Sequence, residues 1–187
     1  ASASASAAIA RAEKGIADAN ASATASREAA LTPELRAKRD AALAEPAPAK
    51  PPQLNEESAE GAAASVGYFL NLYRYAFMTG NTTELAKMSE DRCVFCKSVV
   101  DDAVKLHKNG GWANKWEQNV TNIRYYEKLD GYNYNLVHVF INYGQMTWCY
   151  PGKNPETADP IEGQELKFGV RYVGGRWMIG EGEVISK

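Results

Sequence analysis

Two cysteines three residues apart are the residues of this chain whose types and spacing point most directly to chemistry. Cys93 and Cys96 lie in DRCVFCKSVVDDAVKLH, residues 91–107, which reads as a helix that begins at Asp91 as its N-cap. Residues at positions i and i+3 of a helix have Cβ atoms about 5 to 6 Å apart, so a local disulfide needs little adjustment. We therefore predict a Cys93–Cys96 disulfide at the head of an inward-facing stripe. The stripe continues through Val100, Val104 and His107.

Two other chemistries of this pair stay open. A dithiol redox centre normally follows a strand in a βαβ unit, whereas the segment before Cys93 reads as helical and the sheet after it as antiparallel. Zinc needs four ligands, which Cys93, Cys96, Cys149 and a histidine would supply only if Cys149 folded back onto the helix. We therefore expect no metal and no cofactor. A disulfide implies an oxidising compartment and leaves Cys149 as a buried thiol.

His138 is a weak candidate for a catalytic base, and no other residue is proposed for catalysis. It lies in NLVHVFI, on the strand face shared with Tyr134, Leu136 and Phe140. Histidine titrates near neutrality, so His138 could act as a base in a cavity between sheet and helices. A hydrogen-bonded core residue is the alternative interpretation.

Acidic side chains supply two further clusters. Asp101 and Asp102 are neighbours on a helix and point about 100° apart, so a solvated helix face explains them. Glu181 and Glu183 alternate with glycines on the side of Trp177. On a frayed edge strand they would discourage aggregation, whereas an interior position would require buried partners.

Aromatic residues could line an apolar or glycan-stacking pocket, with ordinary core packing as the alternative. The weak candidates for ligand binding are Tyr73, Tyr134 and Trp177.

The composition divides the chain of 187 residues into two parts, because all ten tyrosines, four tryptophans and five phenylalanines lie after Gln53. Apolar area drives folding, so the core must come from the second part. We predict an Ala-, Ser- and Pro-rich stalk or linker over residues 1–53 and a globular domain over residues 54–187. Marginal helices broken near Thr32 and Pro33 are expected in the first part, followed by a polyproline-type spacer.

Charge and hydropathy exclude several classes of function. The net charge is −2, and no basic stretch is interleaved with aromatic residues, so binding to nucleic acid is not expected. No run of eighteen apolar residues is present, so the sequence as given does not span a membrane. It begins ASASAS without a methionine, which suggests that a leader has been cleaved or omitted. Membrane association is therefore expected only through a cleaved or lipidated N-terminus.

Within the second part, helical patterns come first. A long amphipathic helix is predicted from the N-cap Ser58 to Gly80, which supplies a left-handed stop. A short helix in NTTELAKMS follows, and then the cysteine-containing helix, which ends before Gly110 and Gly111.

Strand patterns follow the helices. NVTNIRYYEKL and YNYNLVHVFINYGQMTWCY are rich in β-branched and aromatic residues, with a hairpin signal at Asp130–Gly131. QELKFGVRYV and RWMIGEGEVIS flank Gly174–Gly175 in the same way. Helices followed by antiparallel strands predict an α+β fold, with three helices packed on one face of a curved sheet.

This order of elements resembles the NTF2-like fold, a SnoaL-like cone in which a curved sheet wraps around helices, over about residues 58–186. More specifically, the sequence is similar to an uncharacterised family of actinobacterial surface lipoproteins with this fold and a Cys-x-x-Cys helix. The residues that carry the resemblance are Glu60-Gly61, Tyr68 to Tyr75, Thr79-Gly80-Asn81, Cys93, Cys96 and Gly110-Gly111. The resemblance implies a signal peptide and a lipid-modified cysteine upstream of residue 1.

Three functions from different classes are consistent with these features. The first is a non-enzymatic binding domain, extracytoplasmic and at the cell surface, secreted or lipid-anchored, that binds an unknown protein or envelope component. The second is a small isomerase- or dehydratase-like enzyme with a base such as His138 in the cone. The third is an assembly module that forms a homodimer through the outer sheet face.

Overall fold

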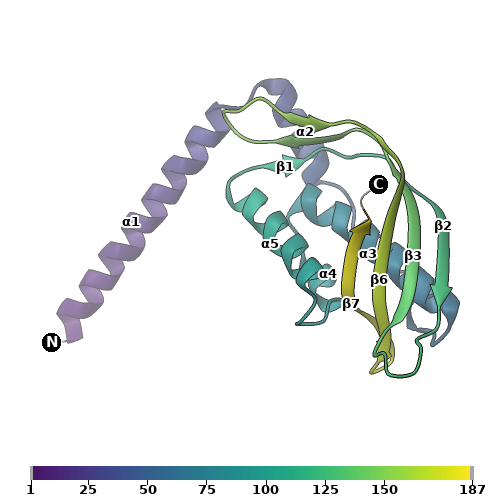
Figure 1. The fold of residues 1–187 in the computed structure, drawn as a ribbon. Coiled ribbons are helices and arrows are strands. Elements are labelled where there is room, and N and C mark those ends of the chain that lie inside the picture. Colours follow the sequence, from purple (N-terminus) through teal and green to yellow (C-terminus); the bar gives the residue numbers. More distant parts are fainter. Residues whose placement is uncertain (1, 186–187) are drawn as a thin grey trace.

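The computed structural model describes residues 2–185 as helices packed against curved antiparallel strands, preceded by a helix that extends away from them (Figure 1). The helices are α1 (Ser2–Ala29), α2 (Pro33–Leu43), the short 3-10 helix η1 (Pro52–Asn55), α3 (Ala59–Thr79), α4 (Thr83–Lys87) and α5 (Val94–Lys108). The strands are β1 (Trp112–Ala113), β2 (Gln118–Tyr126), β3 (Asn135–Tyr143), β4 (Met146–Cys149), β5 (Glu156–Ala158), β6 (Ile161–Val173) and β7 (Arg176–Ile185). None of these helices is both long and apolar enough to cross a membrane.

The four longest strands form one antiparallel sheet in the order β2-β3-β6-β7. A smaller sheet, β1-β4-β5, continues from it, because β4 follows β3 after two residues and β5 precedes β6 by two. The hairpin signal at Gly174–Gly175 is confirmed, whereas β2 and β3 are joined by a longer loop, residues 127–134. The predicted α+β class, with α3, α4 and α5 on an antiparallel sheet, is therefore confirmed (Figure 1).

Helix α3 has the predicted ends. The Ser58 side chain accepts a hydrogen bond of 3.0 Å from the backbone N–H of Gly61, and Gly80 ends the helix with a φ of 78°. Only glycine adopts this left-handed conformation without a steric cost, which makes Gly80 an effective stop. Between these ends, the apolar face of α3 lies against the inner face of the sheet.

Helix α5 begins later than predicted. Its N-cap is Cys93 rather than Asp91, and the Cys93 sulfur accepts the backbone N–H of Cys96 at 3.1 Å. The inward stripe also differs from the prediction, because Val104 is 46% exposed. From Cys96 the buried positions follow the i+3, i+7 and i+10 spacing rather than the i+4 and i+8 spacing. They are Cys96, Val99, Ala103 and Leu106.

The core between the helices and the four-stranded sheet is closely filled. The Phe168 ring on β6 lies 5.8 Å from the ring of Phe69 on α3 and 5.9 Å from that of Phe95 on α5, both edge-on. Val137 and Val139 on β3 are fully buried against these helices. Such contacts between rings and β-branched residues hold the helices in place on the sheet.

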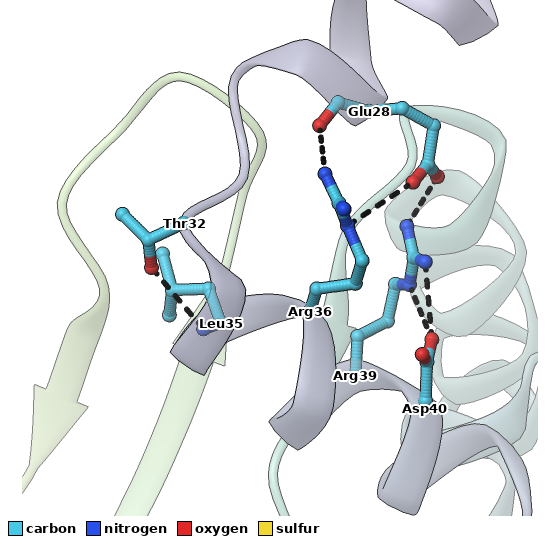
Figure 2. A network of polar contacts seen from close by, with 6 residues as sticks. All are labelled: Glu28, Thr32, Leu35, Arg36, Arg39 and Asp40. Carbon is cyan, nitrogen blue, oxygen red and sulfur yellow. Dashed lines mark hydrogen bonds and ion pairs between the residues drawn. The ribbon is translucent and has the colours of Figure 1, made fainter.

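The N-terminal part is broken where the sequence predicts. Helix α2 begins at Pro33, and the side chain of its N-cap Thr32 accepts the backbone N–H of Leu35 at 3.2 Å (Figure 2). Leu31 and Ala42 are buried in a second core cluster with residues of α3 and β1. The division at residue 53 stays a prediction, although the packing contacts of the domain extend back to Leu31.

Ion pairs join the end of α1 to α2 at this corner (Figure 2). Arg36 donates to the backbone carbonyl of Glu28 at 3.1 Å, and Arg39 donates to the Glu28 carboxylate and to Asp40. The Glu28 and Asp40 side chains are 44% and 62% exposed. Ion pairs with such exposed carboxylates contribute about 0 to 1 kcal/mol each, so they orient α1 more than they stabilise it.

Candidate functional site

A short segment before α5 extends the sheet beyond β7. Ser89 pairs with Ile179 in a parallel bridge. The Glu90 N–H donates to the Ile179 carbonyl at 2.9 Å, and the Ile179 N–H donates to the Met88 carbonyl at 2.8 Å. These bonds cover the edge of β7 at Ile179 and bring the Glu90 side chain to the outer face of the sheet.

Glu90 is the centre of a polar network at this end of the sheet. Its side chain is only 9% exposed. One carboxylate oxygen accepts the Tyr134 hydroxyl at 2.7 Å, and the other accepts Arg171 Nε, while the Arg171 guanidinium lies 5.5 Å above the Tyr134 ring. Burial raises the pKa of Glu90, but the hydrogen bonds from Arg171 and Tyr134 outweigh it and leave this pKa below its ordinary value. The network therefore holds an ionised carboxylate in a largely dry position.

Two glycines make room for the tyrosine. The pairing between β6 and β7 shifts register next to Gly169, which leaves Gly180 as an extra residue in β7. A Cβ atom added to Gly180 would lie 2.2 Å from the Tyr134 ring, and one added to Gly169 would lie 3.3 Å from Tyr134 Cβ. The two glycines thus leave the space at the bulge that the Tyr134 side chain occupies.

An open groove of about 720 Å³ runs beside this network, between the segment before α5 and the turn that joins β6 to β7. We call it the arginine groove, because Arg92, Arg171 and Arg176 line it together with Glu90 and Asp91. Arg92 and Arg176 are exposed. Within residues 2–185, neither forms a salt bridge.

Trp177, one of the predicted ligand-binding residues, lies next to the β6–β7 turn on the inner face of the sheet, opposite to the face that carries Arg171. Its ring is 4% exposed and has the edges of Tyr125 and Tyr172 against it, at 6.4 and 5.5 Å. The Trp177 Nε1–H donates to the Glu56 carbonyl at 2.7 Å, which ties the chain after η1 to the sheet. Trp177 lines a second hollow, but its ring faces are largely covered.

The other predicted aromatic candidates lie apart. Tyr134 belongs to the Glu90 network, whereas Tyr73 lies at the far end of α3, 5.0 Å from Phe77 and 6.2 Å from Trp116. The structure therefore does not bring Tyr73, Tyr134 and Trp177 into one pocket.

His138 lies on the outer face of the sheet, not between the sheet and the helices. The neighbouring Val137 and Val139 occupy the inner face and are fully buried. His138 Nε2 lies 3.1 Å from Glu165 Oε2, and its ring centroid is 4.5 Å from that of Phe140. The predicted grouping with Phe140 on one face is correct, and His138 is hydrogen-bonded as the alternative interpretation expects. The face itself lies outside the sheet rather than in a cavity or core.

The acidic clusters are solvated. Asp101, Asp102, Glu181 and Glu183 are all exposed. For the two glutamates, the extra residue Gly180 changes the alternation of β7, so that they point away from the side of Trp177.

The cysteines are arranged as the sequence indicates. Cys93 and Cys96 are joined by a disulfide, and both are buried. Cys149 is a buried free thiol that lies 3.9 Å from Asn114 Oδ1, and burial raises the pKa of this thiol. Among the residues that the structure describes, no group of three or more histidine, cysteine and acidic side chains is placed to hold a metal ion.

The fold and site together define a disulfide-containing α+β domain with a polar network and a cationic groove at one end of its sheet. Residues 38–183 match the Family of unknown function (DUF6318), and the chain belongs to that family. A comparison with curated protein sequences found no match.

A solved structure shows a similar fold. The crystal structure of the intermembrane space region of the chloroplast protein ARC6 covers 71% of this chain and 99% of its own, with a TM-score of 0.55 and 17% identity. At this level of identity, the similarity concerns the fold alone.

Proposed function

We propose that this chain is a non-enzymatic binding domain that works outside the cytoplasm. The observation that carries the proposal is the filled interior. Phe69, Phe95 and Phe168 occupy the space between the sheet and the helices, where an enzyme of this architecture would hold its substrate. The charged groups that could recognise a ligand lie instead on the surface, in the arginine groove.

The disulfide supports the extracytoplasmic location, because such bonds persist in oxidising compartments. The similar ARC6 region is itself described as an intermembrane space region. We further propose that the domain is an NTF2-like cone displayed at the cell surface as a lipoprotein, as the Cys-x-x-Cys helix and its flanking motifs suggest.

Helix α1 suits the role of a stalk. Its 28 residues span about 42 Å at 1.5 Å per residue. Ile9 and Ile16, its large apolar residues, are 59% and 63% exposed, so this part of the helix does not pack on the domain, whereas Arg27 near its C-terminal end donates to the Lys108 carbonyl at 3.0 Å. A helix of this kind separates a binding surface from an N-terminal anchor.

The location is tested by trapping thiols in intact cells. Cells are quenched in acid, denatured, and treated with a polyethylene-glycol maleimide before or after reduction. We expect one reactive thiol, Cys149, before reduction and three after it, whereas a Cys93→Ser/Cys96→Ser control shows one thiol in both samples. Three reactive thiols before reduction would overturn the extracytoplasmic assignment.

A further inference from the structure

We propose that the arginine groove binds the carboxylates of an acidic segment of a partner protein, with Arg171 as the central contact. This inference deepens the proposed binding function and rests on it. Arg171 is held in a fixed orientation. Its Nε donates to the buried Glu90 carboxylate, and its guanidinium lies over the Tyr134 ring. A guanidinium held on two sides loses little freedom when it binds a ligand.

Arg171 also has unused hydrogen-bonding capacity. A guanidinium has five N–H donors, and Glu90 occupies the Nε side. Within residues 2–185, the two terminal nitrogens of Arg171 make no hydrogen bond, and the side chain is 43% exposed. The two terminal nitrogens of the guanidinium are thus open to the groove, where they can donate two parallel hydrogen bonds to the two oxygens of a carboxylate.

The residues that line the groove carry an excess of positive charge. Four cationic side chains, Lys87, Arg92, Arg171 and Arg176, line the groove with two anionic ones, Glu90 and Asp91, an excess of two positive charges among the lining residues. Of the four cations, Lys87 is also ion-paired with Glu84 at 2.8 Å. The chain as a whole carries −2. The groove is therefore a positive patch on an acidic protein, and it favours an anionic partner.

The shape and the apolar lining favour a peptide over a membrane surface. The groove is open to solvent and has a volume of about 720 Å³, which is within the range of ligand sites. Val173, which is 48% exposed, and Met178 add apolar surface to it. Attachment to anionic lipid typically uses clusters of basic residues alone, whereas this groove has two acidic side chains among its four cations.

The test uses the full chain and a fluorescein-labelled probe, the hexapeptide (Glu-Leu)3, in fluorescence anisotropy titrations. The peptide (Gln-Leu)3 with the same label is the analogue without side-chain charges. We expect the glutamate peptide to bind more tightly than the glutamine peptide. Arg176→Gln should weaken its binding by about two- to fivefold, the effect of losing one solvent-exposed charge contact. Arg11→Gln removes the same charge from the exposed α1 helix and should leave binding unchanged.

Arg171→Lys keeps the positive charge but replaces the planar guanidinium by an ammonium group, which cannot donate two parallel hydrogen bonds. We therefore expect this variant to bind the glutamate peptide more weakly than the wild type. The thermal unfolding of each variant shows whether it still folds. Because Arg176 is exposed and makes no salt bridge in the described chain, Arg176→Gln should unfold as the wild type does and keeps the test decisive.

Two other anionic ligands, a phospholipid membrane and inorganic phosphate, are tested in separate experiments. Sedimentation with phosphatidylglycerol vesicles that exceeds sedimentation with phosphatidylcholine vesicles, together with no binding of (Glu-Leu)3, would overturn the proposal in favour of a membrane. Displacement of the peptide by millimolar inorganic phosphate would overturn the preference for carboxylates. Equal binding by Arg176→Gln and Arg11→Gln would also overturn it. None of these results changes the thiol-trapping result, so failure of this inference is distinguishable from failure of the proposed location.

Discussion

The contact between Gly180 and Tyr134 predicts a substitution whose cost depends on a second residue. A Cβ atom at position 180 would lie 2.2, 2.4 and 2.6 Å from Cε1, Cζ and Oη of Tyr134. The φ of Gly180 is not in the left-handed region, so alanine is unstrained by its own backbone there. Gly180→Ala therefore acts by displacing the Tyr134 ring.

The magnitude follows from the two contacts that the displaced ring loses. Moving the ring breaks the 2.7 Å hydrogen bond from Tyr134 to the Glu90 carboxylate, and a bond to a charged group contributes about 1.5 to 3 kcal/mol. Overpacking a filled site costs about 1 to 3 kcal/mol. Because relief of the overlap also breaks the bond, these costs are not additive, and we expect a loss of about 2 to 3 kcal/mol in the free energy of unfolding.

The measurement is urea-induced unfolding followed by tryptophan fluorescence, in a double-mutant cycle with Tyr134→Ala. In the Tyr134→Ala background, Gly180→Ala should lower the free energy of unfolding by less than about 0.5 kcal/mol, because the ring that the new Cβ would meet is absent. Gly67→Ala is the matched control. Gly67 lies in α3 with nothing within 4 Å of an added Cβ, so alanine there should stabilise by about 0.5 to 1 kcal/mol. An equal cost of Gly180→Ala with and without Tyr134 would refute the reasoning.

Three further predictions concern stability. Replacing Cys93 and Cys96 by serine should lower the free energy of unfolding by about 1 to 2 kcal/mol, since so short a loop constrains the unfolded chain weakly; urea titration with and without reductant measures it. The folded-state pKa of Glu90 is depressed, so its contribution is present above about pH 4.3 and is lost as the pH falls through the folded pKa. The stability difference between wild type and Glu90→Gln should therefore shrink from pH 6 to pH 3 in urea titrations. Gly80→Ala should lower the free energy of unfolding by about 2 kcal/mol, because a Cβ there meets His107 Cγ at 2.8 Å and the φ is 78°; thermal unfolding measures it.

Features of the fold that depend on neighbouring residues were predictable from the sequence. The limits of α3 follow from Ser58 and Gly80, whose side chain and φ act within one helical turn. The disulfide follows from the spacing of Cys93 and Cys96. Each of these features depends on residues within a few positions of one another, so it can be predicted without knowing any tertiary contact.

The Glu90 network depends on residues far apart in the chain. Glu90 is 44 residues from Tyr134 and 81 from Arg171, and none of the three belongs to a motif. The face of β3 was ambiguous for a related reason. LVHVFI is apolar at successive positions on both faces, so its pattern does not separate His138 from Val137. Only the packing of the helices decides which face is inside.

The bulge at Gly180 connects these outcomes. Without an extra residue, strict alternation would place Glu181 and Glu183 on the side of Trp177, facing the core. The bulge reverses the alternation, which exposes both carboxylates, and the missing side chain at position 180 admits the Tyr134 ring. That ring and Glu90 in turn fix the guanidinium of Arg171 at the groove. A single glycine thus accounts both for the exposed acidic edge and for the oriented arginine on which the proposed binding site depends.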